Sequence, residues 1–207
     1  MEITVSRKFK IGEIPSVGPA KKVLIALHGY GQRIAFFQKH FEILAQEHGY
    51  HVYLPEAPHR FYLQGFSGKI GCSWISKYER QWDIDEVNAG LNQLLNHIQN
   101  THPNIPISTL GFSQGGHTLV RWMVTANLDF KQCILWSVDL PSDPIPTDQN
   151  HRLQKIEFAH GNDDPFFTDE RIDNFKSMLK RHQLNPKIHP FIGGHHMHIP
   201  TLVQILG

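Results

Sequence analysis

Apolar residues gather in short continuous runs along the chain. The segment Lys22–Leu27 is apolar after its first residue and ends before His28-Gly29. A strand that is apolar on both faces belongs inside a sheet that helices cover on both sides. Further strands are predicted at 51–54, 105–110, 132–138, 155–159 and 187–192.

Segments with the spacing of a helix lie between these apolar runs. Apolar residues recur three or four positions apart and predict helices within 36–44, 87–98, 114–124, 172–179 and 200–206. Ile3, Val5 and Phe9 fall on odd positions, which predicts an antiparallel first strand with one exposed face. One strand followed by repeated strand–helix units indicates an α/β fold. We expect one compact domain over 1–207, a mostly parallel central sheet with helices on both faces.

The segment 55–80 does not fit this pattern. It has no clear period and is too long for an ordinary connection between a strand and a helix. It is also too aromatic for a disordered segment. We expect a pocket wall or lid, although the aromatic side chains could simply pack on the core. The candidate pocket residues are Phe61, Tyr62, Phe66 and Trp74.

Charge and cysteine content narrow the function classes. The 207 residues carry 20 Lys and Arg against 19 Asp and Glu, so no basic excess favours a nucleic acid partner. No apolar run approaches the length of a membrane span, so stable membrane insertion is not expected. Cys72 and Cys133 fit a reducing, cytoplasmic setting, with one bridge still possible. The sequence leaves the oligomeric state open.

The segment Gly111-Phe-Ser-Gln-Gly115 has the pattern G-x-S-x-G between a predicted strand and a predicted helix. In this context the serine occupies a strained, tight turn that exposes its hydroxyl, and the glycines leave room for crossing chains. A serine that only caps the helix is the alternative. The context favours Ser113 as a nucleophile.

A serine nucleophile needs a base and an acid that orients the base. In this architecture both follow the serine in the chain. The acid candidates are Asp163 and Asp164, which could instead cap a helix, and Asp139. The base candidates are His195, His196 and His198, which could instead form a metal site. No zinc-binding pattern supports a metal.

The predicted oxyanion donors are two backbone N–H groups. The glycine-rich turn His28-Gly-Tyr-Gly31 follows a buried strand and could direct the Tyr30 N–H into the site. The second donor is Gln114, the residue after the nucleophile. An ordinary glycine turn is the alternative. The sequence has no P-loop or dinucleotide fingerprint, and Cys72 is interpreted as a small core residue.

Four motifs in this order resemble the phospholipase/carboxylesterase family of α/β-hydrolases, which includes acyl-protein thioesterases. They are Leu27-His-Gly-Tyr-Gly31, Gly111-Phe-Ser-Gln-Gly-Gly116, His160-Gly-x-x-Asp164-Pro165 and Gly193-Gly194-His195. The resemblance implies a Ser–Asp–His triad that cleaves esters or thioesters without a cofactor. It selects Ser113 as nucleophile, Asp164 as acid and His195 as base.

We therefore expect a serine hydrolase of small-molecule carboxylic esters, with an apolar acyl or aryl group bound by the aromatic segment. The alternatives are a thioesterase or acyltransferase with the same triad, and a binding protein of the same fold without catalysis. A metal-dependent hydrolase is a more distant alternative.

Overall fold

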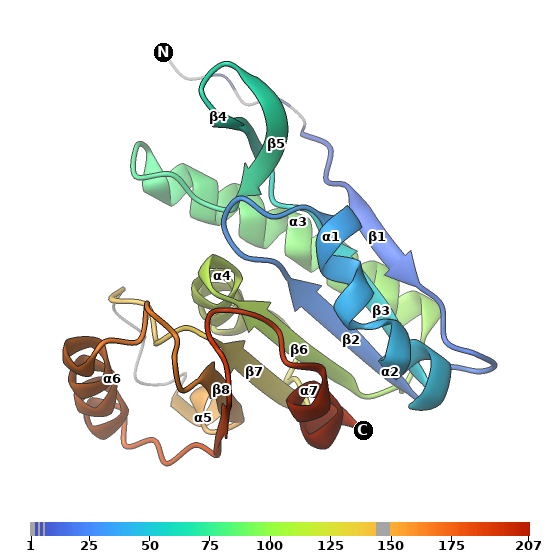
Figure 1. Ribbon diagram of the computed structural model, residues 1–207. Helices are drawn as coiled ribbons and strands as arrows, with labels where there is room; N and C mark the ends of the chain where they lie inside the picture. The colour runs from blue at the N-terminus through green and yellow to red at the C-terminus, as the bar shows by residue number, and fades with distance from the viewer. Residues whose placement is uncertain (1–2, 4, 6, 144–149) are drawn as a thin grey trace.

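A central sheet of seven strands organises the protein. The computed structural model describes residues 3, 5, 7–143 and 150–207. The strands follow the order β1-β3-β2-β6-β7-β8-β9 (Figure 1). β1 pairs antiparallel with β3, and the remaining neighbours pair parallel. The strands are β1 (Ile11–Ile14), β2 (Lys22–Leu27), β3 (Tyr50–Pro55), β6 (Ile107–Phe112), β7 (Gln132–Trp136), β8 (Ile156–Gly161) and β9 (Ile188–Phe191).

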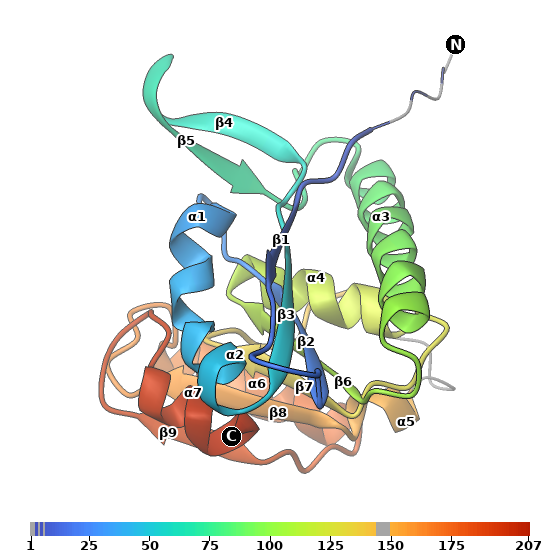
Figure 2. The ribbon, with the colours of Figure 1, turned by 90° about the vertical axis from the view of Figure 1, so that its right-hand side faces the viewer.

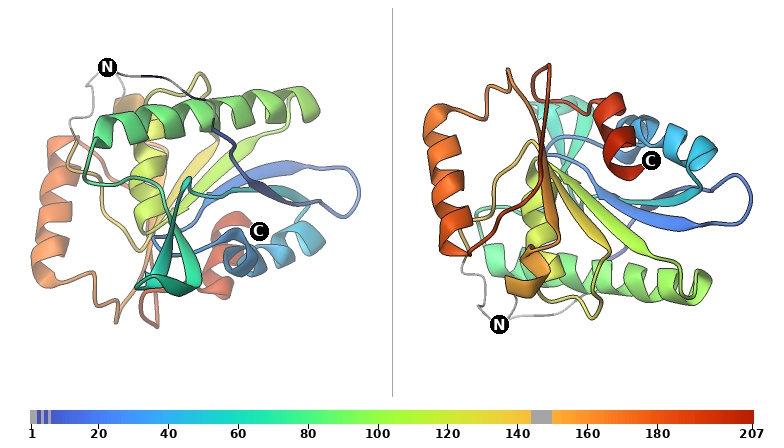
Figure 3. Two further views of the ribbon diagram at one scale, coloured as in Figure 1. Left: turned by 90° about the horizontal axis from the view of Figure 1, so that it is seen from above. Right: turned by 90° about the horizontal axis from the view of Figure 1, so that it is seen from below.

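Helices cover both faces of this sheet (Figures 2 and 3). One face packs against α1 (Ile34–Phe37), the 3-10 segment η1 (Gln38–His40), α2 (Glu42–Glu47) and α7 (Ile199–Leu206). The other face packs against α3 (Arg80–Thr101), α4 (Gln114–Met123), α5 (Asn150–Leu153) and α6 (Asp169–Arg181). This arrangement confirms the predicted α/β class. No described helix is long and apolar enough to cross a membrane.

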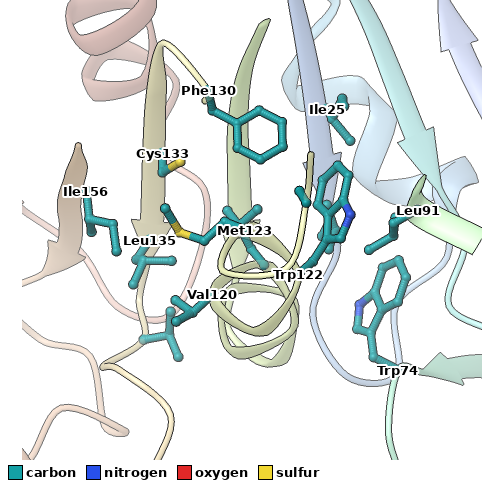
Figure 4. Packing of buried hydrophobic residues seen from close by; sticks show 14 of the residues in the cluster. Ile25, Trp74, Leu91, Val120, Trp122, Met123, Phe130, Cys133, Leu135 and Ile156 are labelled. Atoms are coloured by element: carbon teal, nitrogen blue, oxygen red, sulfur yellow. The ribbon is translucent and has the colours of Figure 1, made fainter. Parts of the chain in front are cut away.

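Alternation along the strands divides the core into two clusters. In β2, Val23, Ile25 and Leu27 face one cluster, whereas Leu24 and Ala26 face the other, and all five are fully buried. Figure 4 shows the first cluster, in which the helix residues Leu91, Val120, Trp122 and Met123 meet strand side chains. Burial on both faces explains why the β2 sequence is continuously apolar.

The segment after β3 folds as a hairpin, which the sequence analysis treated as an aperiodic loop. β4 (His59–Gln64) pairs antiparallel with β5 (Ser67–Ser73), and the pair projects from the body of the molecule (Figures 1 and 2). The residues of the hairpin's outer part are exposed on both sides. Without a buried face, these strands have no reason to alternate apolar and polar residues.

The first strand lies later in the sequence than predicted. The antiparallel first strand is Ile11–Ile14 rather than a strand within 3–9. Ile3 and Val5 are exposed, while Phe9 packs against the core beside Gly90. Residues 4 and 6 of the predicted strand lie outside the described residues.

The helix expected within 36–44 is divided into α1, η1 and α2. Its buried residues Phe37, Phe41 and Leu44 still keep helical spacing toward the sheet. Spacing of apolar residues thus identified the buried face but not the interruptions of the helix.

Candidate active site

The candidate residues lie at the carboxyl edge of the parallel strands. β2 and β6 are neighbours, but the chain continues from β2 to β3 on one side and from β6 to β7 on the other. Ligands bind α/β sheets at such a switch point, outside the carboxyl ends of the strands. The loop His28–Gln32 follows β2, and Ser113 follows β6. Asp164 and His195 follow β8 and β9.

Ser113 occupies a strained turn between β6 and α4. Its φ of 52° and ψ of −122° lie outside the usual regions for a residue with a side chain. A Cβ on Gly111 would lie 2.5 Å from Gly116 Cα, and one on Gly115 would lie 2.4 Å from the Leu27 carbonyl oxygen. These glycines are therefore required by close backbone packing. The turn presents the half-buried serine at the start of α4.

His195 is paired with Asp164. His195 Nδ1 lies 2.8 Å from Asp164 Oδ2, and the Asp164 side chain is fully buried. The other carboxylate oxygen accepts the Phe166 N–H at 2.9 Å. Phe166 and Phe112 pack against the imidazole, with ring centroids 4.6 and 4.9 Å from it. The bond fixes the ring through Nδ1 and leaves Nε2 for another partner.

Ser113 is linked to His195 through its neighbour in the chain, without a direct bond. Phe112, which contacts the His195 ring, precedes Ser113 in the chain. Among the contacts of the described residues, no hydrogen bond joins the Ser113 hydroxyl to His195. Hydrogen bonds of this kind are often long in unliganded enzymes and shorten when substrate is bound.

The other two acid candidates, Asp163 and Asp139, have different contacts from those of Asp164. Asp163 is exposed, and its N–H donates to the Gly193 carbonyl. Asp139 Oδ1 lies 2.9 Å from His117 Nε2 and 3.5 Å from Arg171 Nη2. Burial acts to raise the pKa of Asp139, but the His117 hydrogen bond and the charges of both neighbours lower it overall.

The competing histidines are also engaged elsewhere. His196 is exposed, and its carbonyl oxygen accepts the Trp136 indole N–H at 2.9 Å. His198 Nδ1 lies 2.9 Å from the Thr201 hydroxyl, and its ring stacks on Phe191. Of the three clustered histidines, His195 is the one that contacts Asp164.

The backbone of the loop His28–Gln32, here called the oxyanion loop, leaves the Tyr30 N–H available. Gly29 N–H donates to the Gln32 side chain at 2.8 Å, and Gly31 N–H donates to the Cys72 carbonyl at 2.8 Å. Gln32 N–H donates to the Gly29 carbonyl. Within the described contacts, the Tyr30 N–H has no partner. The loop lies against Ser113, because a Cβ on Gly29 would be 3.3 Å from Ser113 Cβ.

Gln114 contributes through its backbone and its side chain. As the first residue of α4, its N–H has no acceptor within the helix. Its side-chain oxygen accepts the Trp74 N–H at 3.0 Å, and its amide donates to the Ser73 hydroxyl and the Ile75 carbonyl. Gln114, directly after Ser113, therefore also fixes the base of the hairpin.

The His28 side chain holds the start of the oxyanion loop through two hydrogen bonds, a role that the sequence analysis did not assign. Its Nδ1 lies 2.8 Å from the Gly29 carbonyl, and its Nε2 accepts the Ala57 N–H at 3.0 Å. This pattern requires a neutral imidazole with the proton on Nδ1. Burial lowers the pKa of His28, outweighing the Gly29 hydrogen bond and the charge of Glu56, which raise it.

The four aromatic pocket candidates are not brought together. Phe61 stacks on Tyr30 with ring centroids 4.9 Å apart, while Tyr62 and Phe66 are exposed on the hairpin. Trp74 is fully buried in the core near Leu91 (Figure 4), and its indole N–H donates to the His28 carbonyl. The prediction that Trp74 lines an open pocket wall is therefore wrong, because Trp74 is a buried core residue.

Two further features of the described residues bear on metal and thiol chemistry. No group of three or more His, Cys, Asp or Glu there is arranged to hold a metal ion. Cys72 and Cys133 are both buried and free. Burial raises the pKa of the Cys72 thiol and raises that of Cys133 to about 12, which disfavours the reactive thiolate.

Comparison with solved structures identifies the fold. Maize (Zea mays) acyl-protein thioesterase 2 has 18% sequence identity and a TM-score of 0.72, covering 95% of this chain and 96% of that one. A carboxylesterase from Mesorhizobium loti has 14% identity and a TM-score of 0.72, covering 99% and 95%. A carboxylesterase from Bacillus cereus has 16% identity and a TM-score of 0.67, covering 95% and 91%.

The family assignment rests on sequence. Comparison with curated proteins gives no match. The family model described as serine aminopeptidase, S33, matches residues 18–141, more than half of the chain. This region contains both the oxyanion loop and the turn at Ser113. The chain belongs to this serine hydrolase family, and its fold is that of an α/β-hydrolase.

Proposed function

We propose that the protein hydrolyses carboxylic esters through Ser113, His195 and Asp164. The observation that carries the proposal is the 2.8 Å contact between His195 Nδ1 and the buried Asp164 carboxylate. It leaves Nε2 free, and the ring packs on Phe112, the residue before Ser113. An imidazole held in this way can accept the serine proton.

The reaction begins when His195 Nε2 removes the proton from the Ser113 hydroxyl as the oxygen attacks the acyl carbonyl. Asp164 accepts the Nδ1–H hydrogen bond and stabilises the imidazolium. The tetrahedral intermediate then expels the alcohol, which takes the proton from Nε2. Water, deprotonated by the same histidine, attacks the acyl-enzyme and releases the acid and Ser113.

The Tyr30 and Gln114 N–H groups stabilise the negative oxygen of the tetrahedral intermediate. Both groups flank Ser113, and neither has a backbone acceptor in the described contacts. Such donors are oriented before the reaction and act where charge develops. Loss of one should raise the barrier by about 3 kcal/mol.

The acyl group is proposed to lie against the stacked rings of Tyr30 and Phe61. Tyr30 is 61% exposed, so this aromatic surface remains open to a ligand beside the oxyanion loop. Tyr62 and Phe66 extend the exposed aromatic surface along the hairpin. An apolar acyl or aryl group fits this surface better than a charged group does.

Thioesters are the second candidate substrate. The observation that favours them is the similarity of the whole fold to a protein named acyl-protein thioesterase. Matched oxygen and sulfur esters, with and without an alcohol acceptor, separate esterase, thioesterase and acyltransferase activities. An aminoacyl p-nitroanilide tests amide cleavage, because the family model is described as an aminopeptidase.

The deciding experiment compares the native chain with Ser113→Ala on p-nitrophenyl esters of increasing acyl length. We expect the native chain to hydrolyse short to medium acyl groups and Ser113→Ala to stay at background. A fluorophosphonate should label Ser113 in the native chain. Equal rates for the two proteins would refute the mechanism, and no labelling would favour a binding protein. Activity lost in a strong chelator would indicate a metal-dependent hydrolase.

A further inference from the structure

Two consecutive residues after β3 contact both ends of the oxyanion loop. The Ala57 N–H donates to His28 Nε2 at 3.0 Å, at the start of the loop. The Glu56 carboxylate accepts the Ile34 N–H at 3.4 Å, just beyond the end of the loop. Glu56 is itself fixed, because its N–H donates to the Lys10 carbonyl at 2.8 Å. The loop is therefore held between contacts at its two ends.

Glu56 is a carboxylate in an unusual environment. Its side chain is 1% exposed, at the end of a buried strand. Arg33 Nε lies 3.5 Å from Oε2, and Arg60 Nη2 lies 3.7 Å from Oε1, which has no hydrogen bond. A buried carboxylate is costly unless its neighbours compensate for lost hydration. Its partners here belong to the loop end and to β4, so the compensation depends on the position of the loop.

We propose that Glu56 is a positioning residue that holds the Tyr30 N–H toward the oxyanion formed at Ser113. This inference rests on the proposed function and adds a residue to it. Arg33 and Ile34 follow the loop directly, and Glu56 fixes both relative to β3. Without this contact, the loop keeps its bonds at His28 and its backbone bonds to Cys72, but the segment that follows it loses its connection to β3. The Tyr30 N–H is then less firmly oriented, although no catalytic group has been removed.

The expected defect lies in the transition state rather than in substrate binding. Small displacements of an oriented donor weaken the stabilisation of developing charge more than they weaken binding of the neutral ester. Glu56→Ala should lower kcat about tenfold to hundredfold while KM changes by no more than about twofold. Glu56→Gln keeps an oxygen acceptor for the Ile34 N–H and should lose less.

Glu157 provides the matched control. Its side chain is 15% exposed, accepts from Gln132 Nε2 at 2.7 Å and pairs with His189 at 2.7 Å. It lies near the start of β8, at the opposite end of the sheet from Asp164. Glu157→Ala removes a similarly enclosed carboxylate and should keep kcat within about twofold of native, since it lies far from the reacting atoms.

The test measures kcat and KM with a p-nitrophenyl ester, and inhibition by an alkyl trifluoromethyl ketone. Ser113 Oγ adds to the ketone carbonyl, its proton passes to His195, and the carbonyl oxygen becomes an oxyanion. Binding of this adduct should weaken in Glu56→Ala in parallel with kcat. All variants are assayed well below their unfolding temperatures. Equal kcat for Glu56→Ala and Glu157→Ala would overturn the proposal.

Hydrogen exchange separates this proposal from the proposed function. Amides of residues 29–34 should exchange faster in Glu56→Ala than in native protein, and Glu157→Ala should leave them unchanged. If the native chain hydrolyses no ester and Ser113 is not labelled, the proposed function fails, and the exchange data still test the loop contact. Unchanged exchange in Glu56→Ala would overturn the positioning role whatever the activity.

Discussion

Two histidine–aspartate pairs lie at the same edge of the sheet, and they differ in which ring nitrogen meets the carboxylate. His195 contacts Asp164 through Nδ1, whereas His117 contacts Asp139 through Nε2. Nε2 is at the tip of the ring, farthest from the backbone. The first pair therefore leaves the tip of the imidazole open, while the second pair uses it.

Other pairs in the described structure follow the second pattern. His51, His59 and His189 each contact a carboxylate through Nε2. Asp139 also has Arg171 as a second cationic neighbour, whereas Asp164 has a backbone N–H and His195. The comparison shows that proximity of histidine and carboxylate is common in a chain with 15 histidines. The orientation of the ring distinguishes the candidate base.

The largest expected effect is the loss of activity when His195 is replaced by alanine, and His117→Ala is the matched comparison. His195→Ala should lower kcat at least about a thousandfold, because it removes the group proposed to accept the serine proton. His117→Ala should stay within about threefold of native, since its Nε2 contacts Asp139 and is not proposed to take part in the reaction. Steady-state kinetics with a p-nitrophenyl ester measures both. A larger loss in His117→Ala than in His195→Ala would reverse the assignment.

The second prediction concerns the two carboxylates. Asp164→Asn should lower kcat about a thousandfold or more, because the amide no longer selects the imidazole tautomer with Nδ1–H. Asp139→Asn removes a carboxylate whose pKa is lowered by His117 and Arg171 against the effect of burial. That carboxylate stabilises the fold at neutral pH, and the contribution is lost as pH falls through its lowered pKa.

Asp139→Asn should therefore lower the unfolding temperature at pH 7 more than at strongly acid pH, with little change in kcat. Thermal unfolding of native and variant across pH measures this difference. A loss of activity comparable with that of Asp164→Asn would show that Asp139 belongs to the catalytic group.

The smallest expected effect concerns His28, which uses both ring nitrogens. Burial lowers its pKa, so the unfolded chain binds a proton below about pH 6.5 that the folded chain resists. This group therefore destabilises the fold as pH falls from 6.5 toward the lowered pKa. The difference in unfolding temperature between pH 7 and pH 5 should be smaller in His28→Gln than in native protein. An unchanged difference would mean that His28 does not titrate in this way.

The sequence predicted those elements whose pattern is set by burial. β2 begins and ends where its apolar run does, and α6 contains the whole of the helix predicted within 172–179. The hairpin β4–β5 was missed because its exposed strands carry no alternation. The first strand was misplaced because pairing with β3, a partner distant in sequence, decides where it forms.

In the candidate site too, features set by the local sequence could be predicted, whereas features set by contacts between distant residues could not. The strained turn at Ser113 could be predicted because it needs glycines at fixed spacing. The choice among His195, His196 and His198 could not be made from spacing alone, since it depends on which ring meets the carboxylate in space. Trp74 was misassigned because an aromatic residue in an irregular sequence can equally pack on the core. Glu56 had a weak signal, a charged residue directly after a buried strand.

The attachment of the hairpin limits how the entrance to the site can open. Its base is bonded to the first residue of α4 at Ser73, Trp74 and Ile75, and to the Gly31–Gln32 backbone at Cys72. A hinge at this base would drag the nucleophile turn with it. The pairing register shifts between Tyr62 and Gln64, farther out, where the strands can bend without breaking those bonds. Bending that preserves those bonds is therefore confined to the outer half of the hairpin.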